Sequence, residues 1–407
     1  MSVPDPEPVL EIELQETERL AAMAARHLPP SLLPLFGPGF VRSHILFDEF
    51  VYRLALQVFV DAGLAAAAAE WGSTEDIVAR SGLDPRRSMV AVDWMLRHLA
   101  ARGVLTREAG AAGPRFRAEH VLPALDPAPV LAEQRRHDAS CLPSFTLAET
   151  AARDYPAFLR GERSGDEILL APTRLPLWIG YFSNDNVLYA VNNRVGAAAL
   201  EAWMPPGAGA ILELGGGLAS GATAVLERLA VAGRLGEVRA YRFTELVPAF
   251  LRRAQRRLQE RFADASFLTF APLDMNRPFA EQGVGPESVS IVYAVNTLHV
   301  AHDLAFTLAE VCRALGPGGQ LIVSECVRPS PGQTLYPEFV FNLMDTFQAP
   351  RLHPRYRPNG GFLTPEQWTE ALETNGFFDV RVLPDIARIR DVFPTFYVAA
   401  IGATRSR

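Results

Sequence analysis

The segment ILELGGGLASG, residues 211–221, decides the fold expected for this chain. A strand-like apolar run that contains one acid, Glu213, leads into three consecutive glycines, Gly215, Gly216 and Gly217. Glycine has no Cβ, so a turn built from it lets the backbone come close to a ligand. If a helix leaves this turn, the N–H groups of its first turn also point at the ligand. The segment therefore predicts a ligand-binding turn between a strand and a helix, with all three glycines in the site.

Beyond about residue 208 the chain alternates short apolar runs with helical segments. Apolar runs without alternation indicate strands buried on both faces, which belong to a parallel sheet covered by helices. Two final runs, FDVRVLPD and FPTFYVAAIGAT, predict an antiparallel pair that closes the sheet. The predicted class is thus α/β with a Rossmann-like sheet. In an open sheet of this kind the ligand lies at the carboxyl ends of the strands, so we expect it over residues 215–221.

Three ligands compete for the glycine turn. A phosphate-binding loop of the Walker type requires a lysine, and the chain contains none. A dinucleotide would favour a glycine where this chain has Ser220, and it would not favour an acid two residues before the first glycine. S-adenosylmethionine carries a sulfonium and an ammonium group and no phosphate, so it suits a nearby carboxylate such as Glu213. The sequence favours S-adenosylmethionine as the cofactor.

Polar residues follow the next three strands in order. Glu245 ends the second strand, where a carboxylate can accept hydrogen bonds from both ribose hydroxyls, and Leu246 follows it in the same expected site. Asp274 follows the third strand and can accept from an adenine amino group, while Met275 covers the ring. The fourth strand closes with Asn296. A single acid at a strand end is usually a helix cap, whereas three acids at three successive strand ends around a glycine turn, Glu213, Glu245 and Asp274, favour the cofactor site.

Residues 184–330 resemble class I S-adenosylmethionine-dependent methyltransferases. ILELGGGLASGATAVLERL is similar to their first motif, YRFTELVPAFLRRA to their second, and AVNTLHVAHDLAFTLAEVCRALGPGGQLIVSE to their fourth and fifth strands. The closest likeness is to the C-methyltransferase domains of polyketide synthases and their free-standing relatives. The resemblance implies a seven-stranded sheet, with the amino-acid end, the ribose and the adenine of the cofactor held respectively by Glu213, Gly215 and Gly217, by Glu245, and by Asp274 with Met275.

The chain departs from this family pattern at Ala219, where many members have another glycine. An alanine there costs little if the loop stays extended at this position.

His299 and Glu325 are the expected catalytic pair. Methyl transfer is an in-line displacement at an activated carbon, so the protein must mainly position the nucleophile and remove its proton. His299 lies just past the fourth strand, where the resemblance implies a base, and Glu325 ends the fifth strand, where it could hold the imidazole in one tautomer. The plainer interpretation is that His299 caps a helix and Glu325 caps the following loop.

The predicted activity is methyl transfer from S-adenosylmethionine to a small-molecule acceptor of secondary metabolism, by C- or O-methylation. An alternative is a cyclase, in which the α-amino nitrogen of the cofactor attacks its own γ-carbon and gives azetidine-2-carboxylate and methylthioadenosine. Tyr181 and Asn296 would then hold the neutral amine in line. No residue chooses the acceptor or decides whether the methyl group is transferred at all.

The chain divides into four expected parts: a flexible acidic arm, a winged-helix-like dimerisation domain, a helical connector or pocket lid, and the cofactor-binding domain, at residues 1–15, 16–135, 136–205 and 206–407. A winged helix could bind DNA, so the second alternative is a non-catalytic regulator. Residues 1–120 carry 12 arginines against 16 acidic residues, and the whole chain has a net charge of −7, which disfavours a nucleic-acid partner.

Two further expectations concern assembly and compartment. The helices of residues 16–103 carry more apolar surface than a small module needs. Residues 45–120 and GFLTPEQWTEALETNGF also resemble small-molecule O-methyltransferases, whose N-terminal winged-helix domains dimerise, so we expect a homodimer. Cys141, Cys312 and Cys326 show neither disulfide nor zinc-ligand spacing, so we expect no metal and a reducing cytoplasm. No segment is typical of a signal peptide or a membrane span, and we expect no membrane partner.

Overall fold

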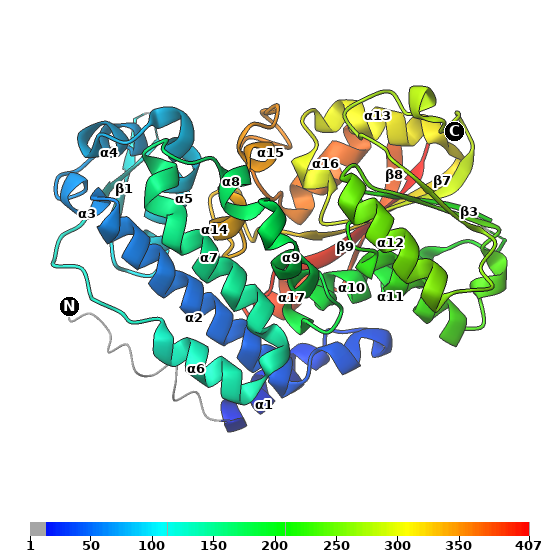
Figure 1. The fold of residues 1–407 in the computed structure, drawn as a ribbon, viewed down its shortest axis with the longest axis horizontal. Coiled ribbons are helices and arrows are strands. Elements are labelled where there is room, and N and C mark those ends of the chain that lie inside the picture. The colour runs from blue at the N-terminus through cyan, green and yellow to red at the C-terminus, as the bar shows by residue number, and fades with distance from the viewer. Residues whose placement is uncertain (1–13, 112, 208, 407) are drawn as a thin grey trace. The chain divides into compact units, whose positions relative to one another are not determined.

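The computed structural model describes residues 14–111, 113–207 and 209–406 (Figure 1). Within these residues the chain forms two compact units. The first contains residues up to 21 together with 37–181 and 332–348, and the second contains 22–36, 182–331 and 349–407. Each unit is described by itself below.

The second unit is built on a seven-stranded sheet with the strand order β5-β4-β3-β6-β7-β9-β8. Its first five strands are parallel, whereas β9 runs antiparallel to β7 and β8 runs antiparallel to β9. This confirms the expected Rossmann-like sheet with a closing antiparallel pair. The strands are β3 (Ala210–Leu214), β4 (Ala240–Thr244), β5 (Leu268–Ala271), β6 (Val289–Val295), β7 (Leu315–Cys326), β8 (Phe377–Leu383) and β9 (Val398–Arg405).

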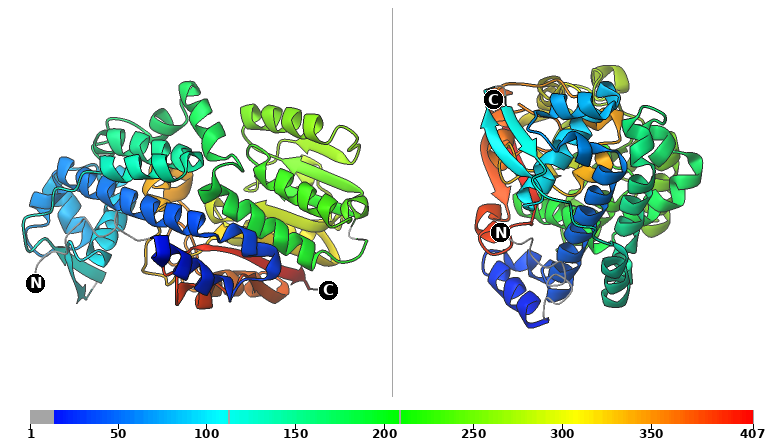
Figure 2. Two further views of the ribbon diagram at one scale, coloured as in Figure 1. Left: turned by 90° about the horizontal axis from the view of Figure 1, so that it is seen from below. Right: turned by 90° about the vertical axis from the view of Figure 1, so that its left-hand side faces the viewer.

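Helices cover this sheet on both sides (Figure 2). Because both faces are covered, the central strands β3, β6 and β9 and the second half of β7 are mostly apolar and almost fully buried. The main helices of the unit are α10 (Val187–Trp203), α11 (Ser220–Val231), α12 (Pro248–Arg261), α13 (Leu304–Ala314), α16 (Pro365–Thr374) and α17 (Ile386–Arg390). Short 3-10 helices are η1 (Pro30–Leu35), η4 (Leu235–Glu237), η5 (Ala280–Gln282) and η6 (Leu298–Val300).

The order of the strands places the ligand edge. The chain moves from β3 outward to β4 and β5 on one side, and then returns to add β6 and β7 on the other side of β3. The reversal between β3 and β6 is the switch point at which sheets of this type bind their ligands. The glycine turn after β3 and the turn after β6 therefore meet at one edge of the sheet.

The first unit is mostly helical, with one two-stranded hairpin. Its helices α4 and α5 begin at side-chain caps, because the Ser73 and Asp84 side chains accept from the N–H groups of Asp76 and Arg86. Its elements are α2 (Pro38–Asp61), α3 (Leu64–Ala67), α4 (Thr74–Ser81), α5 (Pro85–Ala101), β1 (Thr106–Gly110), β2 (Gly113–Arg117), α6 (Ala128–His137), η2 (Ala139–Cys141), α7 (Leu142–Leu159), α8 (Gly165–Leu169), η3 (Pro172–Arg174), α9 (Leu175–Tyr181), α14 (Glu338–Phe341) and α15 (Asp345–Gln348). Helix α1 (Leu14–Ala25) is shared between the two units.

The long helix α2 is covered within its own unit. It packs against α5, α6 and α7, and most of its apolar residues are buried there. The apolar surface that led us to expect a homodimer is therefore used, at least in part, inside one chain.

The segment around residues 336–347 is helical in two separate pieces. It forms two four-residue helices, α14 and α15. The carbonyl of Asn342 accepts from the side chain of Gln348 instead of a backbone N–H of a following turn, so the helix does not continue. Among the described residues no helix combines the length and the apolar character needed to cross a bilayer.

Candidate active site

The glycine turn after β3 is close-packed on two sides. Gly215 and Gly217 have φ angles of +59° and +56°, which favour glycine. A Cβ on Gly215 would lie 2.3 Å from Oγ1 of Thr297, and a Cβ on Gly216 would lie 2.2 Å from the ring of Phe243. Only glycine fits at 215 and 216. The turn is also packed against Thr297, which is two residues before His299.

The backbone at Ala219 is not extended, so the condition under which an alanine would cost little there is not met. Its φ and ψ are +66° and +21°, which is the left-handed region, and it stands immediately before the first residue of α11. The left-handed conformation brings the Cβ of an L-residue too close to its own backbone. The alanine at this position therefore carries a conformational cost that a glycine would not.

Glu213 is a buried carboxylate behind the glycine turn. The residue is only 1% exposed, and its Oε2 accepts a hydrogen bond of 3.0 Å from the hydroxyl of Tyr241. Burial raises the pKa of Glu213 to about 8, the Tyr241 hydrogen bond opposes that shift, and the nearby Glu245 adds to it. Tyr241 was not among the predicted site residues, although it lies on the strand that pairs with β3.

Glu245 joins the glycine turn to the start of α12. Its Oε2 accepts from the N–H of Gly217 and its Oε1 from the N–H of Val247, both at 2.8 Å. Burial raises the pKa of its carboxyl, and these backbone hydrogen bonds oppose the shift. Leu246, which was expected in the same site, is 57% exposed, so its side chain points largely to solvent.

These two acids fit a cationic ligand. In the part of the chain that the structure describes, neither Glu213 nor Glu245 has an ion-pair partner, although both are buried. A buried carboxylate is costly unless an opposite charge approaches it. Space is open beside Gly217, because a Cβ there would meet nothing within 4 Å. The arrangement suits the ammonium and sulfonium groups of S-adenosylmethionine.

An amide from α10 completes this region, and the sequence did not reveal it. Asn193 is fully buried, its Nδ2 donates to Oδ1 of Asn184 at 2.7 Å, and its Oδ1 has no hydrogen-bond partner among the described residues. That oxygen lies 3.7 Å from the position of a Cβ on Gly221, where Oε1 of Glu213 lies at 3.0 Å. An unsatisfied acceptor beside a buried acid is a further place for an ammonium group.

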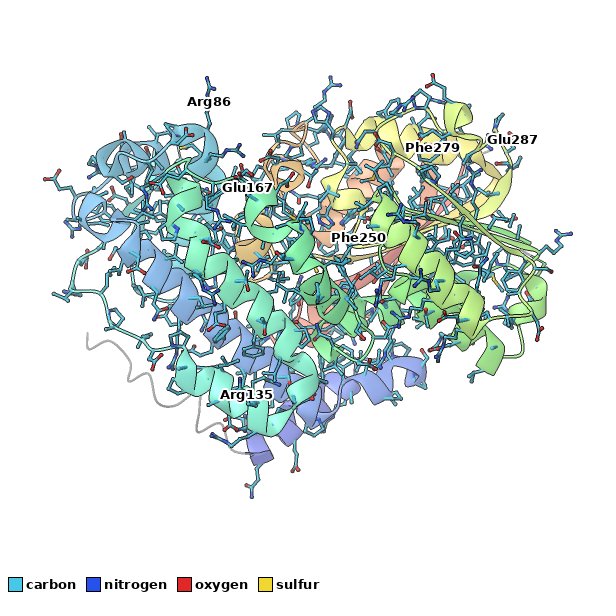
Figure 3. All side chains as sticks on the ribbon, in the orientation of Figure 1. Arg86, Arg135, Glu167, Phe250, Phe279 and Glu287 are labelled. Atoms are coloured by element: carbon cyan, nitrogen blue, oxygen red, sulfur yellow. The ribbon has the colours of Figure 1, made fainter. Side chains whose placement is uncertain are left out.

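Three aromatic rings are in contact near the starts of α10 and α12. The ring of Phe182 contacts those of Tyr189 and Phe250, with centroids 5.1 and 6.3 Å apart (Figure 3 labels Phe250). Ser220, the first residue of α11, donates its hydroxyl to the carbonyl of Phe182. The segment before α10 is thus tied to the helix that follows the glycine turn.

Asp274 and Met275 lie in a turn after β5 and are half-buried. Oδ1 of Asp274 accepts the N–H of Asn276 at 2.9 Å, and its own N–H donates to Gln282 at 2.7 Å. The carbonyl of Met275 accepts from the hydroxyl of Thr307 at 3.0 Å. These contacts stabilise the turn, and the expected contact of both residues with an adenine remains a prediction.

His299 and Glu325 form a buried pair. Nδ1 of His299 lies 2.7 Å from Oε2 of Glu325, and the two residues are 6% and 0% exposed. Oε1 of Glu325 accepts the N–H groups of Thr297, Leu298 and His299 at 3.2, 3.0 and 3.4 Å. A carboxylate only accepts, so Nδ1 of the imidazole is the donor in this pair.

The two residues of the cyclase alternative, Asn296 and Tyr181, belong to different compact units. Asn296 has a φ of +47°, and its Oδ1 accepts the N–H of Cys326 at 3.1 Å. Its side-chain oxygen therefore fastens β6 to β7. Tyr181 belongs to the other compact unit, where its ring contacts those of Trp178 and Phe341. The structure does not bring Tyr181 together with Asn296 in one unit.

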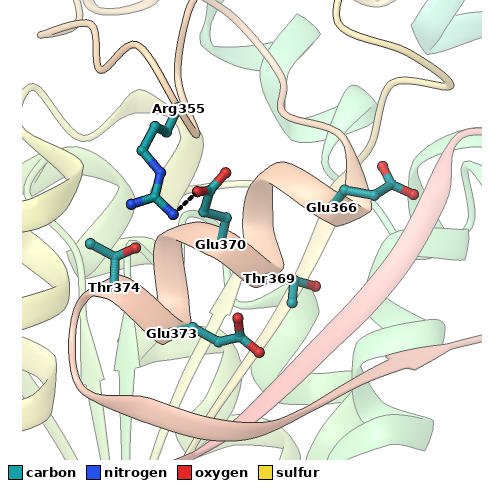
Figure 4. A pocket seen from close by; sticks show the side chains of 6 residues that line it. All are labelled: Arg355, Glu366, Thr369, Glu370, Glu373 and Thr374. Carbon is teal, nitrogen blue, oxygen red and sulfur yellow. Dashed lines mark ion pairs between the residues drawn. The ribbon is translucent and has the colours of Figure 1, made fainter.

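A surface hollow of about 520 Å³ lies along α16 (Figure 4). It is lined by none of the predicted site residues, and Arg355 and Glu370 form an ion pair across it. Its lining is Arg355, Glu366, Thr369, Glu370, Glu373 and Thr374.

Comparisons with known proteins agree with this geometry. Residues 212–321 match the family model described as a methyltransferase domain. Highly reducing polyketide synthase 2 of Gibberella zeae is 30% identical to this chain over 244 residues, which is 58% of this chain and 9% of that synthase. The chain thus spans less than a tenth of the length of this curated relative.

Two solved structures are similar over nearly the whole chain. The carbon methyltransferase of CurJ matches with a TM-score of 0.72 and 21% identity, and covers 97% of this chain and 99% of its own. The carbon methyltransferase of DszA matches with a TM-score of 0.67 and 24% identity, and covers 98% and 96%. At these identities the likeness shows the fold, and it includes the helical first unit as well as the sheet.

Proposed function

Because residues 212–321 form a class I S-adenosylmethionine-dependent methyltransferase domain, we propose that this chain methylates a carbon atom of a small-molecule acceptor in polyketide-type secondary metabolism. The observation that carries the proposal is the buried His299–Glu325 pair, which stands at the strand edge that also holds the glycine turn. The acceptor class is supported by the relatives, which are polyketide synthases and carbon methyltransferases.

The cofactor supplies a methyl group on a sulfonium, which is already activated for displacement. Glu213 and the amide oxygen of Asn193 would hold its charged amino-acid end, since both are buried beside the turn and lack a cationic partner among the described residues. Glu245 would accept from the ribose with the lone pairs that its two backbone hydrogen bonds do not use. Asp274 and Met275 would lie at the adenine.

His299 would remove the proton of the acceptor. With Nδ1–H donated to Glu325, the neutral imidazole carries its lone pair on Nε2, so this nitrogen is the base. Glu325 fixes that tautomer and stabilises the imidazolium that forms, since its other oxygen is held by three backbone N–H groups.

The strength of this base limits the acceptor. An imidazole removes a proton efficiently only when the carbon is acidified by its neighbours. A carbon between two carbonyl groups meets this condition, as in a β-ketoacyl thioester. We therefore propose a β-dicarbonyl acceptor.

The two other functions are less well supported. The cyclase alternative asks Asn296 to hold an amine, whereas its side-chain oxygen is engaged with Cys326. The DNA alternative asks α5 to present its side chains to a groove, whereas Val92, Trp94 and Met95 are buried and Trp94 Nε1 donates to the carbonyl of Leu335. The cyclase remains an outcome of the experiment below.

The test is one mass-spectrometric assay with and without an acceptor. Purified protein is incubated with S-adenosylmethionine alone, and with S-adenosylmethionine and the N-acetylcysteamine thioester of acetoacetate. We expect S-adenosylhomocysteine and a thioester heavier by one methylene only when the thioester is present. Methylthioadenosine formed without an acceptor would overturn the proposal in favour of the cyclase.

Substitution of the base sharpens this assay. His299→Ala should lower the rate about 10²–10⁴-fold and leave cofactor affinity nearly unchanged. His302→Ala is the matched control, because its contact with Asn276 is made through the backbone N–H. An active His299→Ala protein would remove the base from the mechanism.

Assembly and compartment complete the proposal. We propose a homodimer in a reducing compartment such as the cytoplasm, where the three free thiols would persist. Since α2 is largely covered within its own unit, the dimer rests on the resemblance alone. Light scattering at tens of micromolar protein measures the molar mass, and a monomer would contradict it.

A further inference from the structure

One segment of the second unit, residues 351–362, holds the turn that carries His299. The N–H of Arg351 donates to the carbonyl of His302 at 2.6 Å. The guanidinium of Arg357 donates from Nη1 to the carbonyl of Ala301 at 2.6 Å and from Nη2 to the carbonyl of His299 at 2.5 Å. The ring of Phe362 contacts the imidazole, with centroids 4.5 Å apart. We call this stretch the clamp segment.

Arg357 is a buried arginine whose guanidinium is only partly hydrogen-bonded. It is 1% exposed, and its Nε has no hydrogen-bond partner among the described residues. Burial lowers the pKa of Arg357 to about 10, while the charges of Glu325 and Asp303 act in the opposite direction. The guanidinium is therefore a buried cation at neutral pH.

The position of this cation is fixed from its own backbone. The N–H and the carbonyl of Arg357 form two hydrogen bonds of 2.9 Å with His353. The side chain then reaches two carbonyls of the same short turn, η6 and its end. A planar fork with several N–H donors can hold two acceptors at a fixed separation, which an ammonium on a flexible stem does less well.

The contacts on the two sides of His299 are complementary. Glu325 accepts from the N–H groups at the start of the turn and from the imidazole Nδ1, while Arg357 donates to the carbonyls of His299 and Ala301. The backbone of the catalytic turn thus runs between an anion and a cation. Loss of the cation would free the turn to rotate and would let the ring leave Glu325.

We propose that Arg357 is the positioning residue of the His299–Glu325 pair, and that its buried guanidinium holds the turn so that Nδ1 of His299 stays on Glu325. The inference rests on the proposed function only in that His299 is taken as the base. Arg357 acts through His299 and touches neither the glycine turn nor, in this mechanism, the reacting atoms.

The first measurement reads the tautomer of His299. The full chain is labelled with ¹⁵N-histidine, saturated with S-adenosylhomocysteine, and studied by long-range ¹H–¹⁵N correlation, with His299→Gln used to assign the signal. We expect one tautomer, protonated at Nδ1, in the wild type, and a mixture of tautomers in Arg357→Met. A folded Arg357→Met protein in which His299 keeps the single Nδ1–H tautomer would overturn the proposal.

The second measurement separates turnover from binding. With the acetoacetyl thioester, Arg357→Met should lower kcat about 10–100-fold, since a small displacement of a catalytic group has effects of this size. Its KM for S-adenosylmethionine should stay within about twofold. Arg357→Lys keeps the charge and loses the fork, so it should recover part of kcat. An unchanged kcat in Arg357→Met would overturn the proposal.

Arg351→Met is the matched control. It removes an arginine from the same clamp segment, but its side chain is exposed and pairs with Asp303 at 2.6 Å, while its contact with the turn is made by the backbone. Tautomer and kcat should remain as in the wild type. If Arg357→Met does not fold, Arg357→Lys decides, because a wild-type tautomer and rate in that variant would contradict a role of the fork.

Failure of this inference differs from failure of the proposed function. If His299→Ala keeps its activity, the base is wrong, but the tautomer measurement still shows whether Arg357 positions the ring. If His299→Ala is inactive and Arg357→Met behaves as the wild type, only the positioning role is lost.

Discussion

The carboxylates at the ends of β3 and β7, Glu213 and Glu325, are equally buried and differently satisfied. Glu325 accepts three backbone N–H groups and the Nδ1–H of His299. Glu213 has the hydroxyl of Tyr241 and one backbone N–H, and burial raises its pKa to about 8. The hydrogen bonds of Glu325 are thus supplied by its own chain, whereas Glu213 has room for a positive charge from a ligand.

The difference assigns the two acids to different tasks. A carboxylate surrounded by fixed donors keeps its place, as a group that orients a base must do. A buried carboxylate with few partners is poised to bind a cation, because the cation relieves the cost of its burial. Substitutions at the two positions should therefore affect different measured quantities.

The largest effect is expected at Glu325. Glu325→Gln keeps the shape but replaces one acceptor oxygen by an amide that donates, so the imidazole loses its fixed tautomer. We expect kcat for the acetoacetyl thioester to fall about 10²-fold or more, and the calorimetric Kd of S-adenosylmethionine to stay within about threefold. The exposed Glu260→Gln on α12 is the control. A folded Glu325→Gln protein with half of the wild-type kcat would leave Glu325 as a turn cap only.

A smaller effect is expected from Glu213, on the pH dependence of the free energy of unfolding of the cofactor-free protein. Its pKa rises from 4.5 to about 8 on folding, so between these values the unfolded chain is ionised at this position and the folded protein is not. The free energy of unfolding should then fall as the pH rises from about 5 to 8, by up to about 1.4 kcal/mol per pH unit. The raised pKa of Glu245 acts in the same direction.

Urea unfolding at several pH values measures this slope. Glu213→Gln should flatten it, because an amide does not titrate, and saturating S-adenosylmethionine should reduce it in the wild type. A slope that is equal in wild type and Glu213→Gln would contradict the comparison.

The smallest effect concerns the turn itself. Ala219 has a φ of +66°, so Ala219→Gly should relieve the strain of the left-handed backbone and raise the free energy of unfolding by about 1 kcal/mol. Ala222→Gly, inside α11, is the control and should lower it by about the same amount. If both glycine substitutions destabilise the protein, the left-handed backbone at residue 219 is not a source of strain.

Much of the fold and the position of the candidate site could be predicted from local sequence. The glycine run, the buried strand pattern and the acids at successive strand ends predicted the α/β sheet and the place of the ligand. They could do so because parallel strands bring their carboxyl ends to one edge, so residues far apart in the chain become neighbours by rule. The pairing of His299 with Glu325 follows from the same rule, since β6 and β7 are adjacent.

Other features depend on contacts that no local pattern encodes. The amide oxygen of Asn193, on α10, lies near Gly221 and Glu213, and Arg357 reaches the His299 turn from a loop about 58 residues further along the chain. Neither lies at a strand end, so periodicity and motif spacing did not single them out. The same holds for residues 332–348, which join the first unit although their neighbours in sequence belong to the second.

The sequence by itself therefore determined the sheet, its ligand edge and the chemistry of the strand-end side chains, because these follow from strand order and residue type. The tertiary structure alone decided the left-handed backbone of Ala219, the exposure of Leu246, the use of the Asn296 oxygen between β6 and β7, and the cation behind His299. Each of these depends on which groups meet in three dimensions and on which hydrogen bonds burial then requires them to make.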